Sequence, residues 1–126
     1  MLKGSKLAGF VATCDATRAR AFYEGTLGLD LVEDNGFSLV FDSRGSSLRV
    51  QRVDTVAPHT YTTLGWDVDD IVAQVRELAA RDVAFLRVPG LVQDDDGIWH
   101  TPDGSMVAWF HDPDGNTLSL AQHRAR

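Results

Sequence analysis

The feature that most constrains the fold is an order of predicted elements that occurs twice along the chain. Residues 6–13 have the apolar pattern of a β-strand, and either Asp15 or Thr17, just after it, is placed to cap a helix. The same signals return at residues 61–68, with Asp69 and Asp70 at the start of a second helix. Asp15 and Asp69 are about 54 residues apart. This spacing indicates a duplicated supersecondary unit rather than a solenoid, because a solenoid needs at least three repeats.

Further strands are expected after each helix, with three candidates in the first half and four in the second. The first helix is expected to run to about Thr26, and Gly28 ends it. The strands expected after it cover residues 29–32, 37–42 and 47–53. In the second half, the helix is followed by strand candidates at residues 83–87, 98–101, 106–111 and 117–121. We therefore expect a single domain, 1–126, with unit one at about 5–56 and unit two at about 60–123.

The last two strands are joined by a strong turn signal. Pro113 suits the second position of a type I turn, and Gly115 suits the left-handed position after it. Asp112 is placed to cap the turn with its side chain, and Asn116 begins the return strand. The stretch therefore predicts a hairpin with a bulged return strand.

Charge and composition exclude several classes of function. The formal net charge of −6 disfavours non-specific binding to nucleic acid. No apolar run approaches the roughly 20 residues that a membrane helix needs, so no membrane partner is expected. Cys14 is the only cysteine, so no internal disulfide forms, and we expect a reducing cytoplasm. Cys14 itself is interpreted as a small buried residue rather than a nucleophile.

Two motifs carry a resemblance to a known family. Phe22–Leu29 (FYEGTLGL) and Trp109–Asn116 (WFHDPDGN), with the duplicated element order, resemble the vicinal oxygen chelate superfamily. That superfamily includes glyoxalase I, extradiol dioxygenases, fosfomycin-resistance enzymes and bleomycin-resistance proteins. The resemblance implies an α+β fold in which two paired β-α-β-β-β units form a curved mixed sheet around a cleft, with the helices on the outer face. It also implies a homodimer.

The residues at the family's metal-binding positions are unusual. In the metalloenzymes of this superfamily, His, Gln or Glu side chains on the inner face hold a divalent metal. Counting from the motifs places these positions at Ala8, at Arg49 or Gln51, at Thr63 and at Ser119. Ala, Thr and Ser are poor ligands for Zn, Ni or Fe. We therefore expect no metal and no cofactor.

Alternation along the strands predicts the face that meets a ligand. Large apolar residues fall on one face of each sheet and small or polar residues on the other, which suits a wet cleft. The candidate ligand-binding residues are Phe10, Arg49, Gln51, Thr63, Asp67, Trp99, Trp109 and Ser119. Arg49 is interpreted either as a ligand for a carboxylate or phosphate or as a partner of Asp67. Phe10, Tyr61, Trp99 and Trp109 either stack a flat ligand or belong to the core or a dimer contact.

Two classes of function, ligand binding and catalysis, remain open from the sequence. The first is a metal-free small-molecule-binding protein of the glyoxalase/bleomycin-resistance type, which sequesters a flat organic ligand in the cleft. The alternative is a glyoxalase-like lyase, an isomerase or a dioxygenase with displaced metal ligands, built from Gln51 with His100 or His111. A metal-free enzyme in which Arg49 polarises an oxyanion is a further alternative. Whether the chain is an enzyme is therefore left open.

Overall fold

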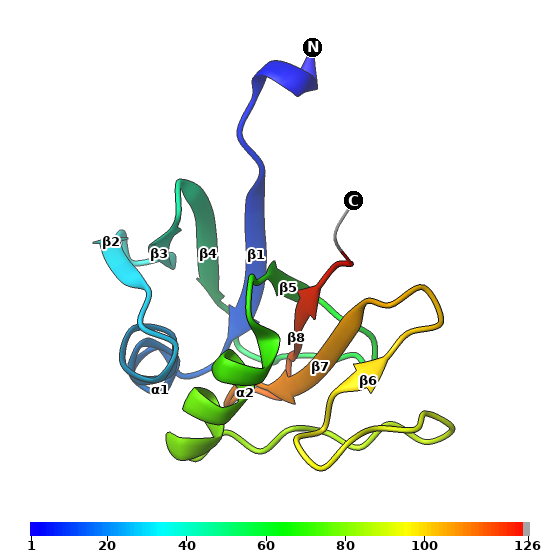
Figure 1. Cartoon of the computed structure of the whole chain (residues 1–126). Helices are drawn as coiled ribbons and strands as arrows, with labels where there is room; N and C mark the ends of the chain where they lie inside the picture. Colours follow the sequence, from blue (N-terminus) through cyan, green and yellow to red (C-terminus); the bar gives the residue numbers. More distant parts are fainter. Residues whose placement is uncertain (125–126) are drawn as a thin grey trace. The chain divides into compact units, whose positions relative to one another are not determined.

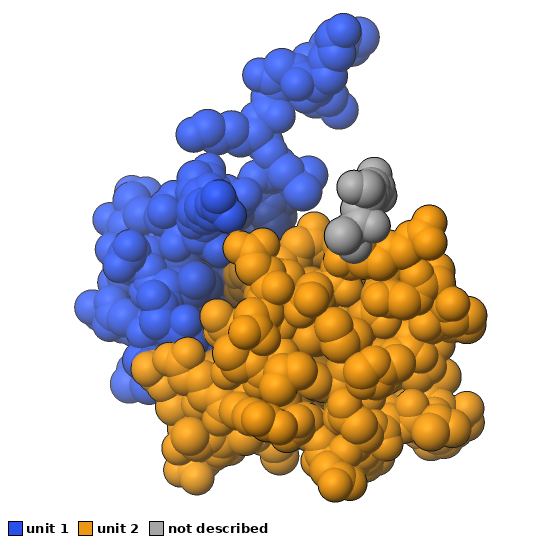
Figure 2. All heavy atoms as spheres, in the orientation of Figure 1, with its two compact units in different colours: residues 1–58, 112–116 blue, residues 59–111, 117–126 orange. Residues whose placement is uncertain are grey.

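A computed structural model describes residues 1–124, so the last two residues of the expected domain lie outside the described residues. The chain divides into two compact units (Figure 2). The first contains residues 1–58 and 112–116, and the second contains residues 59–111 and those from Thr117 onward. The turn at 112–116 therefore belongs to the first unit, although the strands on either side of it belong to the second.

The first unit contains one mixed four-stranded sheet (Figure 1). Its elements are a 3₁₀ turn η1 (Leu2–Gly4), β1 (Ala8–Thr13), α1 (Ala16–Arg20), η2 (Ala21–Thr26), β2 (Asp30–Asp34), β3 (Ser38–Ser43) and β4 (Ser46–Arg52). The strand order is β1-β4-β3-β2. β1 and β4 are parallel, whereas the other neighbouring pairs are antiparallel.

The second unit repeats this topology. Its elements are β5 (Leu64–Asp67), α2 (Ile71–Ala80), β6 (Trp99–His100), β7 (Met106–His111) and β8 (Thr117–Gln122). The strand order is β5-β8-β7-β6, and the first and last strands are again parallel neighbours. The repeated β-α-β-β-β order confirms the expected α+β class.

The helix starts follow the expected capping chemistry, with two differences. Asp15 accepts a 3.0 Å hydrogen bond from the Arg18 amide, as an N-cap should. In the second unit the N-cap is Asp70, not Asp69. The first helix is not a single α-helix, because it continues as the π-helix η2, in which the Leu27 amide bonds to the Phe22 carbonyl. Helical hydrogen bonds between residues five apart are rare, and the periodic apolar pattern of the sequence does not indicate them.

The core of each unit lies between its helical segment and one sheet face. In the first unit, Tyr23 of η2 is fully buried against Phe41 of β3, with the ring centroids 5.9 Å apart. Leu48 and Val50 of β4 are buried on the same face as Phe41. In the second unit, the side chain of Phe110 in β7 is fully buried. The sheet faces therefore follow the expected alternation.

The expected strand at residues 83–87 is wrong. This segment forms one isolated bridge, from Phe85 to Phe110, and the Leu86 amide donates to the Trp109 carbonyl. β6 pairs with the first part of β7, from Met106 to Val107. Because that part of the β7 edge is already occupied, the segment at 83–87 pairs only with the remaining part.

Among the helices of residues 1–124, none combines the length and the apolar character that are needed to cross a membrane.

Candidate ligand-binding site

The structure brings three of the predicted ligand-binding residues together in the first unit. Phe10 and Arg49 are register partners on the parallel strands β1 and β4. Gln51 lies two residues beyond Arg49 and therefore points to the same face of the sheet. Phe10 is 49% exposed, Arg49 is half-buried and Gln51 is exposed. All three lie on the face opposite Leu48.

The other five predicted residues lie in or beside the sheet of the second unit. Ser119 of β8 is the register partner of Trp109 of β7, and Trp99 of β6 stacks on Trp109 with ring centroids 6.2 Å apart. Thr63 precedes β5, and Asp67 ends it. Alternation places Asp67 on the same face as these aromatic residues. Ser119 is buried, whereas Thr63 and Asp67 are exposed.

A pocket of about 320 Å³ lies in the second unit. This volume is at the small end of the range for ligand sites. Its lining is apolar and aromatic with four hydroxyl groups: Thr60, Tyr61, Thr62, Leu86, Val88, Trp109 and Thr117. Of the eight predicted ligand-binding residues, only Trp109 lines this pocket. The lining contains no carboxylate, imidazole or amine, so these side chains are suited to binding an uncharged flat molecule rather than to transferring protons.

Two contacts fix the orientation of Trp109 in the pocket wall. Its indole Nε1 donates a 3.1 Å hydrogen bond to the hydroxyl of Thr62. Its ring stacks on Trp99 with an interplanar angle of 26°. Because both the polar edge and one face of the indole are held within the protein, the remaining ring surface is preorganised for a ligand.

Leu86 and Val88, which also belong to the lining, were not predicted from the sequence. They belong to an irregular segment that Gln93 holds together. The Gln93 side chain accepts a 2.6 Å hydrogen bond from the Val88 amide and donates to the carbonyls of Leu86 and Gly97 at 2.9 and 2.7 Å. No periodic pattern marks this arrangement, because the hydrogen bonds of one side chain replace a regular backbone ladder.

Gly65 and Ser119 meet closely on the same face. An ideal Cβ atom built on Gly65 would lie 2.6 Å from the Ser119 hydroxyl oxygen, so a side chain at Gly65 would displace that hydroxyl. The two residues are register partners on β5 and β8. The glycine is therefore required by a close approach in the sheet.

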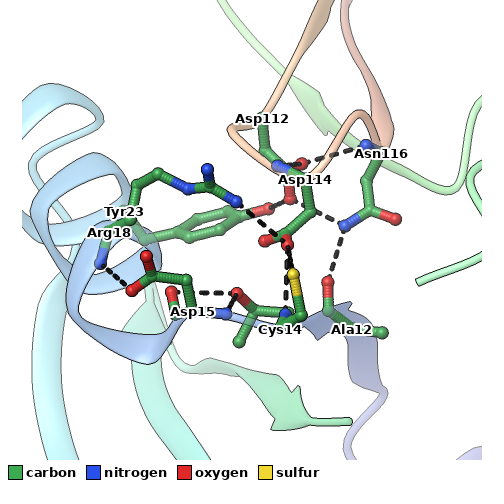
Figure 3. Close-up of polar contacts among 9 residues, drawn as sticks. Ala12, Cys14, Asp15, Arg18, Tyr23, Asp112, Asp114 and Asn116 are labelled. Atoms are coloured by element: carbon green, nitrogen blue, oxygen red, sulfur yellow. Dashed lines mark hydrogen bonds and ion pairs between the residues drawn. The ribbon is translucent and has the colours of Figure 1, made fainter. Parts of the chain in front are cut away.

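A polar cluster in the first unit surrounds the turn at 112–116 (Figure 3). Asp112 is buried, and its Oδ2 accepts hydrogen bonds from the Tyr23 hydroxyl at 2.6 Å and from Asn116 Nδ2 at 2.8 Å. Its Oδ1 accepts from the amides of Asp114 and Asn116. Asn116 Nδ2 also donates to the Ala12 carbonyl of β1. These bonds satisfy both carboxylate oxygens of Asp112 and fix the turn, so the role of this aspartate is structural. Oδ2 of Asp114, by contrast, is buried without a hydrogen-bond partner among the described residues.

The interpretation of Cys14 as a buried residue is wrong. Cys14 is exposed, and both its amide and its thiol donate to Oδ1 of Asp114, at 3.1 and 3.3 Å. The hydrogen bond to Asp114 is the main cause that raises the pKa of the Cys14 thiol. The thiol is therefore held in its protonated form, which is a weak nucleophile.

The residues at the family's ligand positions do not fit a metal ion. Ala8, Thr63 and Ser119 offer no imidazole, thiolate or carboxylate. Within residues 1–124, no group of three His, Cys, Asp or Glu side chains is placed to hold a metal.

All four histidines are exposed, and three have partners within their own unit. The Nε2 atoms of His100 and His123 lie 3.0 Å from carboxylate oxygens of Asp94 and Asp67, respectively. His59 stacks on Tyr61, with ring centroids 4.8 Å apart. None of the four lines the pocket.

Comparisons with known proteins agree with this fold. A family model described as Glyoxalase/Bleomycin resistance protein/Dioxygenase superfamily matches residues 7–120. No curated protein is similar enough in sequence to match the chain.

Several solved structures share the fold over nearly the whole length of both chains. The antibiotic-binding protein TnmS3 from Streptomyces sp. CB03234 is 27% identical, with a TM-score of 0.72, over 95% of this chain and 96% of that one. A member of the same superfamily from Sphaerobacter thermophilus is 24% identical, with a TM-score of 0.75, over 94% and 97%. Lactoylglutathione lyase from Agrobacterium tumefaciens is 16% identical, with a TM-score of 0.71, over 94% and 92%.

Proposed function

Since this chain belongs to the Glyoxalase/Bleomycin resistance protein/Dioxygenase superfamily, we propose that it binds and sequesters a small, flat organic molecule without a metal and without chemical conversion. The observation that carries this proposal is the pocket of the second unit. It presents an oriented indole, the Tyr61 ring and the aliphatic Leu86 and Val88, but no acid or base. Such a lining gains free energy by removing apolar surface from water.

The comparison with TnmS3 supports binding rather than catalysis. That protein binds an antibiotic and is 27% identical to this chain over nearly its full length. The similarity to lactoylglutathione lyase, at 16% identity, extends to the fold alone. The threonine hydroxyls of the pocket orient a ligand through its polar edge. The ligand class proposed is therefore an uncharged aromatic compound with one or two hydrogen-bonding groups.

The test is a titration of chelator-treated protein with 2-naphthol, a neutral planar probe, followed by tryptophan fluorescence and thermal shift. We expect saturable binding, with one probe per chain and a raised melting temperature. Trp109→Leu is expected to weaken binding by about tenfold or more, because it removes the stacking surface. Trp66→Phe is the matched control, since Trp66 lies in β5 and does not line the pocket.

Two results would overturn the proposal. One is binding that requires added Ni, Zn, Mn or Fe(II), and the other is conversion of the probe to a product. An unchanged affinity in Trp109→Leu would place the site elsewhere. The chelator treatment removes bound metal, and the melting transition of Trp109→Leu without probe shows whether that variant is folded.

We also propose that the protein forms a homodimer, as the family resemblance implies. Light scattering after size-exclusion chromatography tests this, and a mass of one chain at micromolar concentration would contradict it.

A further inference from the structure

The sheet face of the first unit that carries Phe10 and Arg49 has its own chemical character. The two residues are register partners, with β1 and β4 adjacent in Figure 1. Val40 of β3 is the partner of Arg49 on the other side and is 7% exposed. An aromatic ring and a valine therefore flank a guanidinium in the middle of the sheet, and the exposed amide of Gln51 lies next along β4.

Arg49 differs from three of the other four arginines of this unit, and the fourth, Arg44, lies exposed in the turn between β3 and β4. Arg18, Arg20 and Arg52 are each paired with a carboxylate, at 3.4, 3.2 and 2.8 Å. Within residues 1–124, Arg49 has neither an ion pair nor a hydrogen bond to another side chain. A guanidinium keeps its charge in proteins and offers five donors in a planar fork. A half-buried guanidinium without a partner therefore favours an incoming anion.

The remaining groups on this face define what else a ligand meets. The hydroxyl of Ser47, two residues before Arg49, is enclosed and has no hydrogen-bond partner among the described residues. Three carboxylates belong to the same face: Glu33 is the partner of Val40, Asp42 is the partner of Ser47, and Asp30 is the partner of Asp42. None of them forms an ion pair with Arg49, and all three are exposed. These three carboxylates disfavour a highly charged ligand, so a singly charged one is expected.

We propose that this face is a second binding site, which takes a small organic anion with a planar carboxylate on an apolar or aromatic body. The carboxylate receives two parallel N–H bonds from the Arg49 guanidinium, as such groups do in bidentate pairs. The body of the ligand lies against the Phe10 ring and covers its exposed surface. The site is formed by the first unit alone, and it does not depend on the uncharged ligand proposed for the second unit.

The experiment uses 2-naphthoate, the charged counterpart of 2-naphthol, with the full chain. Binding is measured by calorimetry and by the side-chain Nε–Hε signal of Arg49 in nitrogen-15 NMR spectra. We expect 2-naphthoate to shift this signal. We also expect Arg49→Gln to weaken binding by roughly ten- to a hundredfold, the range for a lost hydrogen bond to a charged group.

Three further variants and one inorganic anion sharpen the test. Arg49→Lys keeps the charge but not the fork and should recover only part of the affinity. Arg44→Gln is the matched control, because it removes the same charge from the exposed turn between β3 and β4. Phe10→Ser should weaken 2-naphthoate but leave inorganic phosphate unaffected. A phosphate affinity equal to that of 2-naphthoate would show a bare anion site and overturn the proposed ligand class.

The proposal fails if 2-naphthoate leaves the Arg49 signal unmoved. It also fails if the folded Arg49→Gln and Arg49→Lys variants bind 2-naphthoate as the wild type does. These results are independent of the test of the pocket, because that test measures the binding of neutral 2-naphthol to the wild type and to Trp109→Leu.

Discussion

The hydroxyl of Tyr23 donates a 2.6 Å hydrogen bond to Oδ2 of Asp112, and both residues are buried in the first unit. Burial and the charge of Asp112 raise the pKa of Tyr23 above its usual range, so the phenol stays a donor. The bond joins η2 to a turn 89 positions away in the sequence. It thereby fixes the turn at 112–116 to the helical segment of this unit.

We predict that Tyr23→Phe lowers the free energy of unfolding by about 1.5–3 kcal/mol, the range for a hydrogen bond to a charged group. The variant keeps the ring packing but leaves a buried carboxylate oxygen with one donor fewer. Urea unfolding measures the change. Tyr61→Phe is the control, because Tyr61 is 66% exposed and should change stability little. Equal stability of Tyr23→Phe and wild type would show that the bond contributes nothing.

We predict that Gly65→Ala destabilises the protein by about 1–3 kcal/mol, the usual cost of overpacking. The new Cβ would stand 2.6 Å from the Ser119 hydroxyl oxygen. Ser119→Ala removes that oxygen, so the double variant should recover part of the loss. A double-mutant cycle from urea unfolding measures the coupling. Additive effects of the two substitutions would exclude the close approach as the cause.

We predict a pH-dependent contribution from Asp34. Hydrogen bonds from Arg52, at 2.8 and 2.9 Å, lower the pKa of Asp34 to about 2. The folded pKa lies below the unfolded value of about 3.9, so the stabilisation is present above that value and is lost as the pH falls toward 2. The pair is exposed, so its effect is small. The urea midpoints of wild type and Arg52→Gln should differ more at about pH 6 than at about pH 3.

An NMR titration provides the direct check on Asp34. Its carboxyl should titrate near 2 in the wild type and return toward its ordinary range in Arg52→Gln. A midpoint that is unchanged by the substitution would rule out Arg52 as the cause.

We predict that Gln93→Ala loosens the pocket wall. The Val88 amide loses its 2.6 Å acceptor, and the carbonyls of Leu86 and Gly97 lose their donor. Hydrogen exchange at the Val88 amide should quicken by about tenfold or more, because local opening becomes easier. Gln74→Ala on α2 is the control. Unchanged exchange at Val88 would show that the backbone alone holds this segment.

Local chemistry made much of the fold predictable. Asp15 caps its helix as expected, because the signal lies within three residues of the amide that it binds. The turn at 112–116 has its Asp112 cap and a left-handed Gly115, both set by the residues of the turn itself. Alternation placed Phe10 and Leu48 on opposite faces, because the side-chain period of a strand is two.

The candidate sites were only partly predictable. Trp109 was predicted to be a ligand-binding residue from its aromatic side chain. Leu86 and Val88 were not predicted, because the Gln93 side chain that positions them belongs to a segment without periodicity. The segment at 83–87 has the residue types of a strand, yet β6 already occupies part of the edge that it would need.

The sequence by itself determined the duplicated element order, the capping aspartates, the hairpin turn and the alternation of faces, since each depends on neighbours within a few residues. Only the tertiary structure decided which of these residues meet. Cys14 is exposed, and its thiol donates a hydrogen bond to Asp114, which lies 100 positions away in the sequence. Arg49 faces Phe10 without a carboxylate partner. Such pairings depend on strand register and loop paths, which many distant contacts fix together and no short stretch of sequence specifies.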